Sequence, residues 1–358
     1  MMGVENRENW WPLLSIRPVS SSRKVVLSDA LNRRRAAVDA NALLEFLSAR
    51  YRGSASTAGG HKLADQLAER GWFPSAPVDA TLVDRINHWW KRGWSSSLRY
   101  YLWSRGRPQV DGKDSTGDVR RAVITEYLGE GEAPSRGSFD SLRVVELPEP
   151  SPLPAEMTVG QVLMARRSIR SYARVEASAQ ILSSVLWNGL ANVRQRQQRV
   201  PKTPIDYLRS YGIAFDFHLA VFDVASIEPG IYRYDILNHR LLEHRVGNFR
   251  EEVTSLLVGM QSPMTASWTL VISADIPRYQ WRYRHEHALR NLYIGSGRVA
   301  QLLILLGQAH GFGSVPTPAM LDSACGELFG MDPAKELPIY TITMGPLTSA
   351  PGEERRRA

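Results

Sequence analysis

A proline-rich segment near the middle of the chain constrains the fold more than any other feature. Residues 147–156 hold four prolines within ten positions. Proline lacks a backbone donor and fixes φ, so such a run suits neither a helix interior nor a central strand. We therefore expect residues 148–156 to be an extended linker between an amino-terminal region, 1–147, and a second domain, 157–347, with a disordered tail at 348–358.

Helical spacing of apolar residues recurs in three segments before the linker, at 40–51, 61–71 and 80–92. Gly71 fits the C-cap of the second of these helices. Trp89 and Trp90 are adjacent in the third, so one should pack inward while the other faces a different domain or a partner. We expect a small helical or winged-helix-like region that binds a peptide or a partner protein.

The second domain interleaves the two kinds of secondary structure. Helical patterns cover 157–172, 179–190 and 287–310, and strand patterns cover 215–224, 230–235, 267–274 and 338–345. This order predicts an α+β fold with a mixed, mostly antiparallel sheet flanked by helices.

Charge and cysteine content narrow the function classes. The 44 Lys and Arg exceed the 36 Asp and Glu by eight, which is compatible with an acidic partner. We find no zinc-finger spacing, phosphate loop or RNA-recognition signature, so we expect no nucleic acid partner. The single Cys325 excludes an internal disulfide, and the start of the chain has no signal-peptide pattern. No run of about 20 apolar residues is present, so we expect a cytoplasmic protein without a membrane partner.

The strongest local signal is the sequence Arg-Arg-Ser-Ile-Arg-Ser-Tyr at residues 166–172. Guanidinium groups fork onto phosphate or carbonyl oxygens, and a serine hydroxyl adds a short hydrogen bond. These seven residues alone fit an anion site and a solvated basic turn equally well.

In its context this segment resembles the opening motif of the nitroreductase family. Four later segments resemble one branch of that family, the SagB-type dehydrogenases of peptide natural-product pathways: 229–241, 281–284, 297–316 and 328–345. The resemblance covers at least 157–347 and extends more weakly into the amino-terminal region. It implies an FMN-binding domain of the nitroreductase type.

The resemblance also implies an activity and partners. Members of this branch oxidise thiazolines and oxazolines in ribosomally made peptides to thiazoles and oxazoles. It thus implies a precursor-peptide substrate, cyclodehydratase partner proteins and a homodimer with FMN at its interface. The residues that match the cofactor-binding positions are Arg166, Arg167, Ser168, Arg170, Ser210, Gly212, Ser314 and Val315.

The expected proton-handling element of the branch is a Lys-Tyr pair, which corresponds here to Arg282 and Tyr283. An arginine holds its proton too tightly to act as a base, so the departure bears on catalysis. Tyr283 remains the candidate, with Arg282 and Arg284 favouring its ionised form. Two alternatives stay open: a related flavin-dependent oxidoreductase with a different substrate, and a silent peptide-binding scaffold with a decayed flavin site.

Two further segments, residues 209–212 and 285–287, hold polar residues of weaker predictive value. Where the family places a Pro-Ser-small-Gly stretch against the flavin, this chain keeps Ser210 and Gly212 but has the bulky Tyr211 between them. His285 and His287 alternate as metal ligands can, but no third ligand follows at a useful spacing, so we expect no metal.

Overall fold

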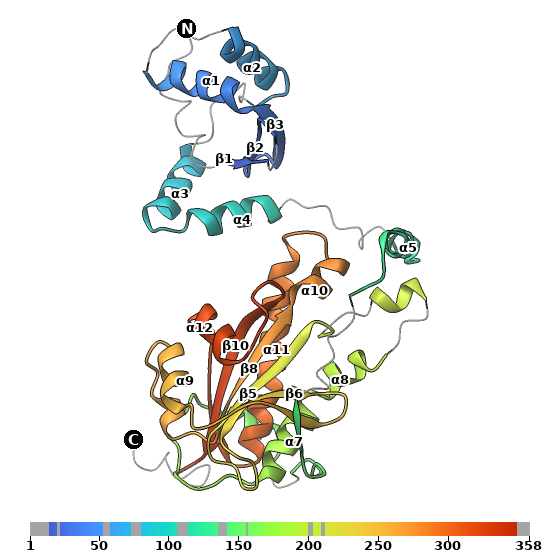
Figure 1. Cartoon of the computed structure of the whole chain (residues 1–358), viewed down its shortest axis with the longest axis vertical. Coiled ribbons are helices and arrows are strands. Elements are labelled where there is room, and N and C mark those ends of the chain that lie inside the picture. Colours follow the sequence, from blue (N-terminus) through green and yellow to red (C-terminus); the bar gives the residue numbers. More distant parts are fainter. Residues whose placement is uncertain are drawn as a thin grey trace. The chain divides into compact units, whose positions relative to one another are not determined.

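The computed structural model describes residues 14–19, 22–52, 58–72, 80–105, 114–134, 142–154, 157–199, 203–208 and 212–348. The chain divides into two compact units, Met1–Gln109 and Val110–Ala358 (Figure 1). The tail expected at 348–358 lies, apart from its first residue, outside the described residues.

The first unit is a three-stranded sheet followed by helices. Its elements are β1 (Leu14–Pro18), β2 (Lys24–Asp29), β3 (Arg34–Asp39), α1 (Ala40–Arg52), α2 (Ala58–Glu69), α3 (Ala80–Lys91) and α4 (Ser95–Arg105). The strands form an antiparallel meander in the order β1-β2-β3. The expected helices are present. The three strands were not expected, because charged residues interrupt their apolar alternation.

The first unit confirms the expected cap at Gly71 and the expected difference between the two adjacent tryptophans, while a contact of Trp90 with another domain or a partner stays a prediction. Gly71 adopts a φ of 68°, and the amide of Trp72 donates to the carbonyl of Leu67 across 2.8 Å, which closes α2 with a glycine cap. The adjacent tryptophans of α3 face different sides: Trp89 packs against a small core around Ile86, and Trp90 is exposed.

The second unit holds the remaining elements. Its helices are α5 (Asp118–Glu130), α6 (Val159–Ala165), α7 (Ala179–Gly189), α8 (Ala191–Gln197), η3 (Pro204–Leu208), α9 (Arg250–Leu256), η4 (Ser262–Met264), α10 (Ile276–Arg282), α11 (Ala288–Ala309) and α12 (Asp322–Leu328). Its strands are β4 (Arg143–Glu146), β5 (Phe215–Val221), β6 (Gly230–Asp235), β7 (Arg240–Val246), β8 (Trp268–Asp275), β9 (Phe312–Thr317) and β10 (Glu336–Pro346).

These strands form one sheet in the order β4-β7-β6-β5-β8-β10-β9, and each neighbouring pair is antiparallel. The predicted α+β class and mostly antiparallel sheet are confirmed. The strands β4, β7 and β9 had not been predicted, because they are short or follow directly on a turn.

Helices cover both faces of the sheet. On one face, α7 and α11 bury a large core that includes Phe217, Trp268 and Leu303. On the other face, α9 and α12 bury a second core that includes Phe249 and Cys325. No helix in the described ranges is long and apolar enough to cross a membrane.

The proline-rich segment has neither helix nor strand over 147–154, and within the second unit it contacts α7. The hydroxyl of Ser183 donates to the carbonyl of Pro148 at 2.5 Å, and the amide of Ser151 donates to Ser184 Oγ at 2.9 Å. The absence of helix and sheet agrees with the proline content. The role of this segment as a domain boundary stays a prediction.

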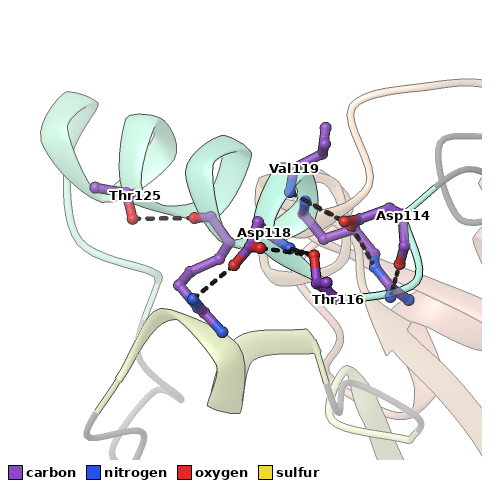
Figure 2. Close-up of polar contacts among 7 residues, drawn as sticks. Asp114, Thr116, Asp118, Val119 and Thr125 are labelled. Atoms are coloured by element: carbon purple, nitrogen blue, oxygen red, sulfur yellow. Dashed lines mark hydrogen bonds and ion pairs between the residues drawn. The ribbon is translucent and has the colours of Figure 1, made fainter.

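The helix α5 starts from a polar turn, shown in Figure 2. The carboxylate of Asp114 accepts the amides of Val119 and Arg120 at 3.1 and 3.0 Å, and Arg120 Nε donates to it at 2.9 Å (Figure 2). Burial opposes ionisation of Asp114, yet these donors hold its pKa below the usual range. The turn fixes where α5 begins.

Candidate functional site

The arginine segment, residues 166–172, leaves the helix that precedes it. The hydroxyl of Thr158 caps α6 and Gln161 completes a capping box. The helix then ends at Ala165, and Arg166 turns into extended backbone with ψ of 122°. The expectation of a helix over 157–172 is therefore wrong for 166–172, because this stretch pairs with a strand instead.

The partner of the arginine segment is β9. Ser168 forms a parallel bridge with Ser314, and the amide of Ile169 donates to the carbonyl of Ser314 at 2.9 Å. Two glycines make the close approach possible. A Cβ on Gly313 would lie 2.8 Å from Ile169, and one on Gly345 would lie 2.6 Å from the ring of Tyr172.

Tyr172 anchors the end of the segment. Its buried hydroxyl lies 2.8 Å from the carbonyl of Ile169 and 2.9 Å from that of Thr343, and its amide donates to Thr265 Oγ1 at 3.1 Å. Burial raises the pKa of this phenol well above its usual range. The ring is therefore a neutral structural fastener that holds the arginines against the sheet.

The polar side chains of the segment point outward. Arg167, Ser168 and Arg170 are exposed and Arg166 is half-buried. Arg167 Nη1 donates to the carbonyls of Met164 and Arg166 at 3.0 and 2.8 Å. Within the described residues, no carboxylate forms an ion pair with these arginines. Their charge is available to an anion, so this surface fits the phosphate of FMN.

Ser314 and Val315 lie beneath the arginine segment. Both side chains are buried, at 3% and 2% exposed. Ser314 reaches the segment through its main chain, and Val315 faces Thr343 of β10. The structure thus places these two predicted residues beside Ser168, in the same group as the arginines.

Gly212 belongs to a different end of the sheet. Its φ of 74° is one that favours glycine, and Gln197 Nε2 donates to the Gly212 carbonyl at 3.1 Å. The turn after it is joined to β8, since the amide of Asp275 donates to the carbonyl of Ala214 at 2.9 Å. Ser210 lies outside the described residues.

Arg282 and Tyr283 close α10. Asp275 caps this helix by accepting the amide of Arg278 at 3.0 Å, and the amide of Tyr283 donates to the carbonyl of Tyr279 at 3.0 Å. The Arg282 guanidinium carbon lies 5.1 Å from the centre of the Tyr283 ring. The Nε of Arg282 is buried and has no hydrogen-bond partner among the described residues. A cation therefore sits beside the candidate catalytic phenol.

Other elements of the second unit contact the residues on either side of Arg282 and Tyr283. The Arg284 guanidinium lies 3.6 Å from the ring centre of Tyr127 on α5 and forms an ion pair with Glu130. Trp281 contacts Tyr127 and also Tyr207 of η3, with ring centres 6.2 and 5.1 Å apart. No local pattern in the sequence predicts this packing, because the contacts join positions more than 70 residues apart.

The predicted residues therefore form two groups within one chain. Ser314 of β9 pairs with Met344 of β10, and Met344 pairs with Trp268, the first residue of β8. Tyr283 follows α10, which begins after Asp275, the last residue of β8 (Figure 1). The strand has eight residues, so its ends lie about 24 Å apart. One chain does not bring Tyr283 next to the arginine segment.

Histidines and the cysteine have structural settings. The rings of His285 and His287 lie 6.4 Å apart, and no metal-binding group of three or more His, Cys, Asp or Glu occurs in the described part of the chain. His218 is buried, and its Nε2 lies 3.3 Å from Glu336 Oε1. Cys325 is buried, and burial raises its pKa to about 12.

Comparison with known families agrees with this geometry. The nitroreductase family model matches residues 163–346, about half of the chain. The chain therefore belongs to the nitroreductase family and is an oxidoreductase by family. The expectation of FMN is confirmed at the level of the family, and the outward-facing arginines fit its phosphate.

Two individual proteins are similar to this chain in sequence. Trifolitoxin operon protein TfxC of Rhizobium leguminosarum bv. trifolii is 30% identical over 294 residues, which is 78% of this chain and 80% of that protein. A putative nitroreductase of Methanocaldococcus jannaschii is 26% identical over 194 residues, or 53% of this chain and 91% of that protein.

A solved structure supports the fold. The putative nitroreductase of Anabaena variabilis superposes with a TM-score of 0.50 at 20% identity, covering 68% of this chain and 49% of that one. This chain therefore spans about half the length of that protein.

Proposed function

We propose that this protein oxidises thiazoline and oxazoline rings of a precursor peptide to thiazoles and oxazoles, with FMN as the hydride acceptor and dioxygen as the final oxidant. The similarity to the trifolitoxin operon protein carries the proposal. Since 78% of 358 residues is about 279, and only 196 residues lie from 163 onward, at least about 83 matched residues precede the family domain. The likeness thus extends to the region that the family model leaves out.

In this proposal one group of residues binds FMN and another handles the proton. Arg166, Arg167 and Arg170 bind the phosphate and ring oxygens of FMN, and Ser168 adds a neutral hydrogen bond. FMN, when bound there, would supply the acceptor for the hydride of the ring carbon. Tyr283 takes the proton from the neighbouring α-carbon, and the Arg282 guanidinium lies beside its ring. The gain in aromaticity drives the reaction.

The proposal includes a homodimer. The arginine segment and Tyr283 lie at opposite ends of β8, so a second copy placed in reverse would bring the Tyr283 of one copy near the arginines of the other. The long helix α11 supports this arrangement, because Tyr293, Ile294 and Leu302 are large apolar residues that it leaves exposed. Stable contact with cyclodehydratase proteins is part of the same proposal.

The first test is an absorption spectrum of the purified protein with chromatography of the released chromophore. We expect oxidised-flavin bands and FMN. The second is mass spectrometry of a thiazoline-containing peptide after incubation in air, with expected loss of two hydrogen atoms per ring. A yellow protein that leaves thiazolines and oxazolines unchanged would contradict the ring-oxidation assignment and leave a different flavin-dependent reaction.

Arg282 favours a second candidate, a silent scaffold that binds the peptide. An arginine in place of the family's lysine, with its Nε buried, cannot exchange protons readily. A scaffold would remain colourless after incubation with FMN yet bind the peptide. The variant Arg282→Lys separates the two, since it should raise turnover only in a chain whose flavin site is intact.

A further inference from the structure

The net positive charge of this protein comes from its first unit. Residues 1–109 hold 17 Lys and Arg against nine Asp and Glu, so their net charge is 17 − 9 = +8. Residues 110–358 hold 27 of each sign and are neutral overall. The second unit, which carries the candidate flavin site, thus contributes none of the net positive charge. An acidic peptide would be drawn to the first unit.

An exposed aromatic surface lies on the first unit where α3 meets α4. We call it the aromatic shelf, and it consists of Trp89, Trp94 and Tyr101. Trp94 and Tyr101 are 59% and 43% exposed. The ring of Trp89 lies edge to face with that of Trp94 at 5.6 Å and stacks on that of Tyr101 at 6.2 Å.

The turn between the helices gives the shelf a defined shape. Gly93 adopts a φ of 74°, which favours glycine, and its amide donates to the carbonyl of Trp90 at 2.9 Å. The amide of Trp94 then donates to the carbonyl of Trp89 at 3.0 Å. This local geometry holds the aromatic rings together before any ligand arrives.

Basic residues flank the shelf. The Arg105 guanidinium lies 6.0 Å from the ring centre of Tyr101, and Arg92 Nη1 donates to His88 Nδ1 at 3.0 Å. Residues 80–105 contain five Lys and Arg but a single acid, Asp84. Within the described residues neither Arg92 nor Arg105 forms an ion pair with a carboxylate. The surface therefore offers exposed rings beside available positive charge.

We propose that the aromatic shelf docks an acidic peptide segment that carries apolar or aromatic side chains, and that this segment belongs to the substrate peptide, away from the ring that is oxidised. The proposal rests on the proposed function for the identity of the peptide. Carboxylates of the segment pair with Arg92 and Arg105, while its apolar side chains cover Trp94 and Tyr101. Docking at a separate unit raises the concentration of the rings at the flavin site.

The packing of the shelf favours a peptide over a nucleic acid. Single-stranded nucleic acid binds by stacking bases on open ring faces. Here Trp89 and Tyr101 already stack on each other, and Trp94 meets Trp89 edge to face. Edges and partly covered faces suit aliphatic and aromatic side chains better than a run of bases.

The test is fluorescence anisotropy with the full-length, FMN-loaded protein. The probe is a fluorescein-labelled synthetic peptide that alternates glutamate with leucine and phenylalanine. Trp94→Ala and the pair Arg92→Glu, Arg105→Glu should each weaken binding by about tenfold or more. Two exposed residues of the same unit serve as matched controls: Leu44→Ala, which removes a side chain 62% exposed on α1, and Lys62→Glu on α2.

Several outcomes would overturn the proposal. Equal binding by Trp94→Ala and wild type, equal loss in Lys62→Glu, or equal binding of a peptide with lysine in place of glutamate would each do so. Tighter binding of single-stranded DNA than of the acidic peptide would assign the shelf to nucleic acid. Because anisotropy needs no turnover, shelf-dependent binding by a protein that fails to oxidise rings would sustain the docking proposal and refute only the ring oxidation.

Discussion

The amide of Ile169 donates to the carbonyl of Ser314 across 2.9 Å. This single bond lets a stretch of chain that follows a helix run beside the edge strand of the sheet. Ile169 then faces inward, while Ser168 and Arg170 on either side face outward. The alternation of an extended backbone thus separates the residue that faces the sheet from those that we propose bind an anion.

Removing the hydroxyl of Tyr172 tests whether that fastening matters. Tyr172→Phe removes the hydroxyl that lies within hydrogen-bond distance of the carbonyls of Ile169 and Thr343. We expect a loss of about 1–3 kcal/mol in the free energy of unfolding and weaker FMN binding. Urea denaturation and flavin titration measure the two effects. Tyr101→Phe, at an exposed ring, should change neither, and unchanged stability in Tyr172→Phe would refute the fastening role.

The close approach at Gly345 gives a second prediction. A Cβ there would lie 2.6–3.1 Å from atoms of the Tyr172 ring. We expect Gly345→Ala to cost about 1–3 kcal/mol and to shift the arginine segment, which lowers affinity for FMN. The control is Gly326→Ala in α12, where a Cβ meets nothing within 4 Å. It should stabilise the protein by up to about 1 kcal/mol. Equal stability of the two variants would contradict the prediction.

The fold was predictable to the extent that its signals are local. The apolar periodicity of α7, α11 and β8 identified those elements, and the arginine segment stood out by residue type alone. The contacts of that segment were not predictable, because Ile169 and Ser314 are 145 positions apart. Likewise, the separation of Tyr283 from the arginines follows from the register of β8, β9 and β10, which no local pattern encodes.

Tyr283 carries the chemical prediction. Tyr283→Phe keeps the ring that packs on Tyr279, with centres 4.8 Å apart, but removes the only group at this position that can accept a proton. We expect turnover of a thiazoline peptide to fall by at least about 100-fold while FMN remains bound. Stopped-flow reduction of the flavin measures the chemical step directly.

The control for Tyr283 is the neighbouring phenol. Tyr279→Phe removes a hydroxyl that donates to the carbonyl of Ala288 at 2.8 Å, so it should lower stability without a comparable loss of turnover. Full activity in Tyr283→Phe would show that another group handles the proton.

The pH dependence of stability should depend on His239. Its Nδ1 lies 2.7 Å from Tyr234 Oη and its Nε2 lies 2.8 Å from Ser183 Oγ. Burial, with the charge of Arg194, lowers its pKa from 6.5 to about 4. The unfolded chain therefore takes up a proton below pH 6.5 that the folded chain resists. Stability should be constant above that pH and fall progressively as the pH drops toward about 4.

His239→Gln isolates this contribution, because glutamine does not titrate and can keep one of the two hydrogen bonds. His244 and His310 also have lowered pKa values from burial, so some loss of stability at low pH persists in the variant. We expect the urea midpoint of wild type to fall more steeply between neutral pH and about pH 4 than that of His239→Gln. Parallel curves would mean that the folded protein accommodates a charged His239, and that the bonds to Tyr234 and Ser183 do not depend on a neutral ring.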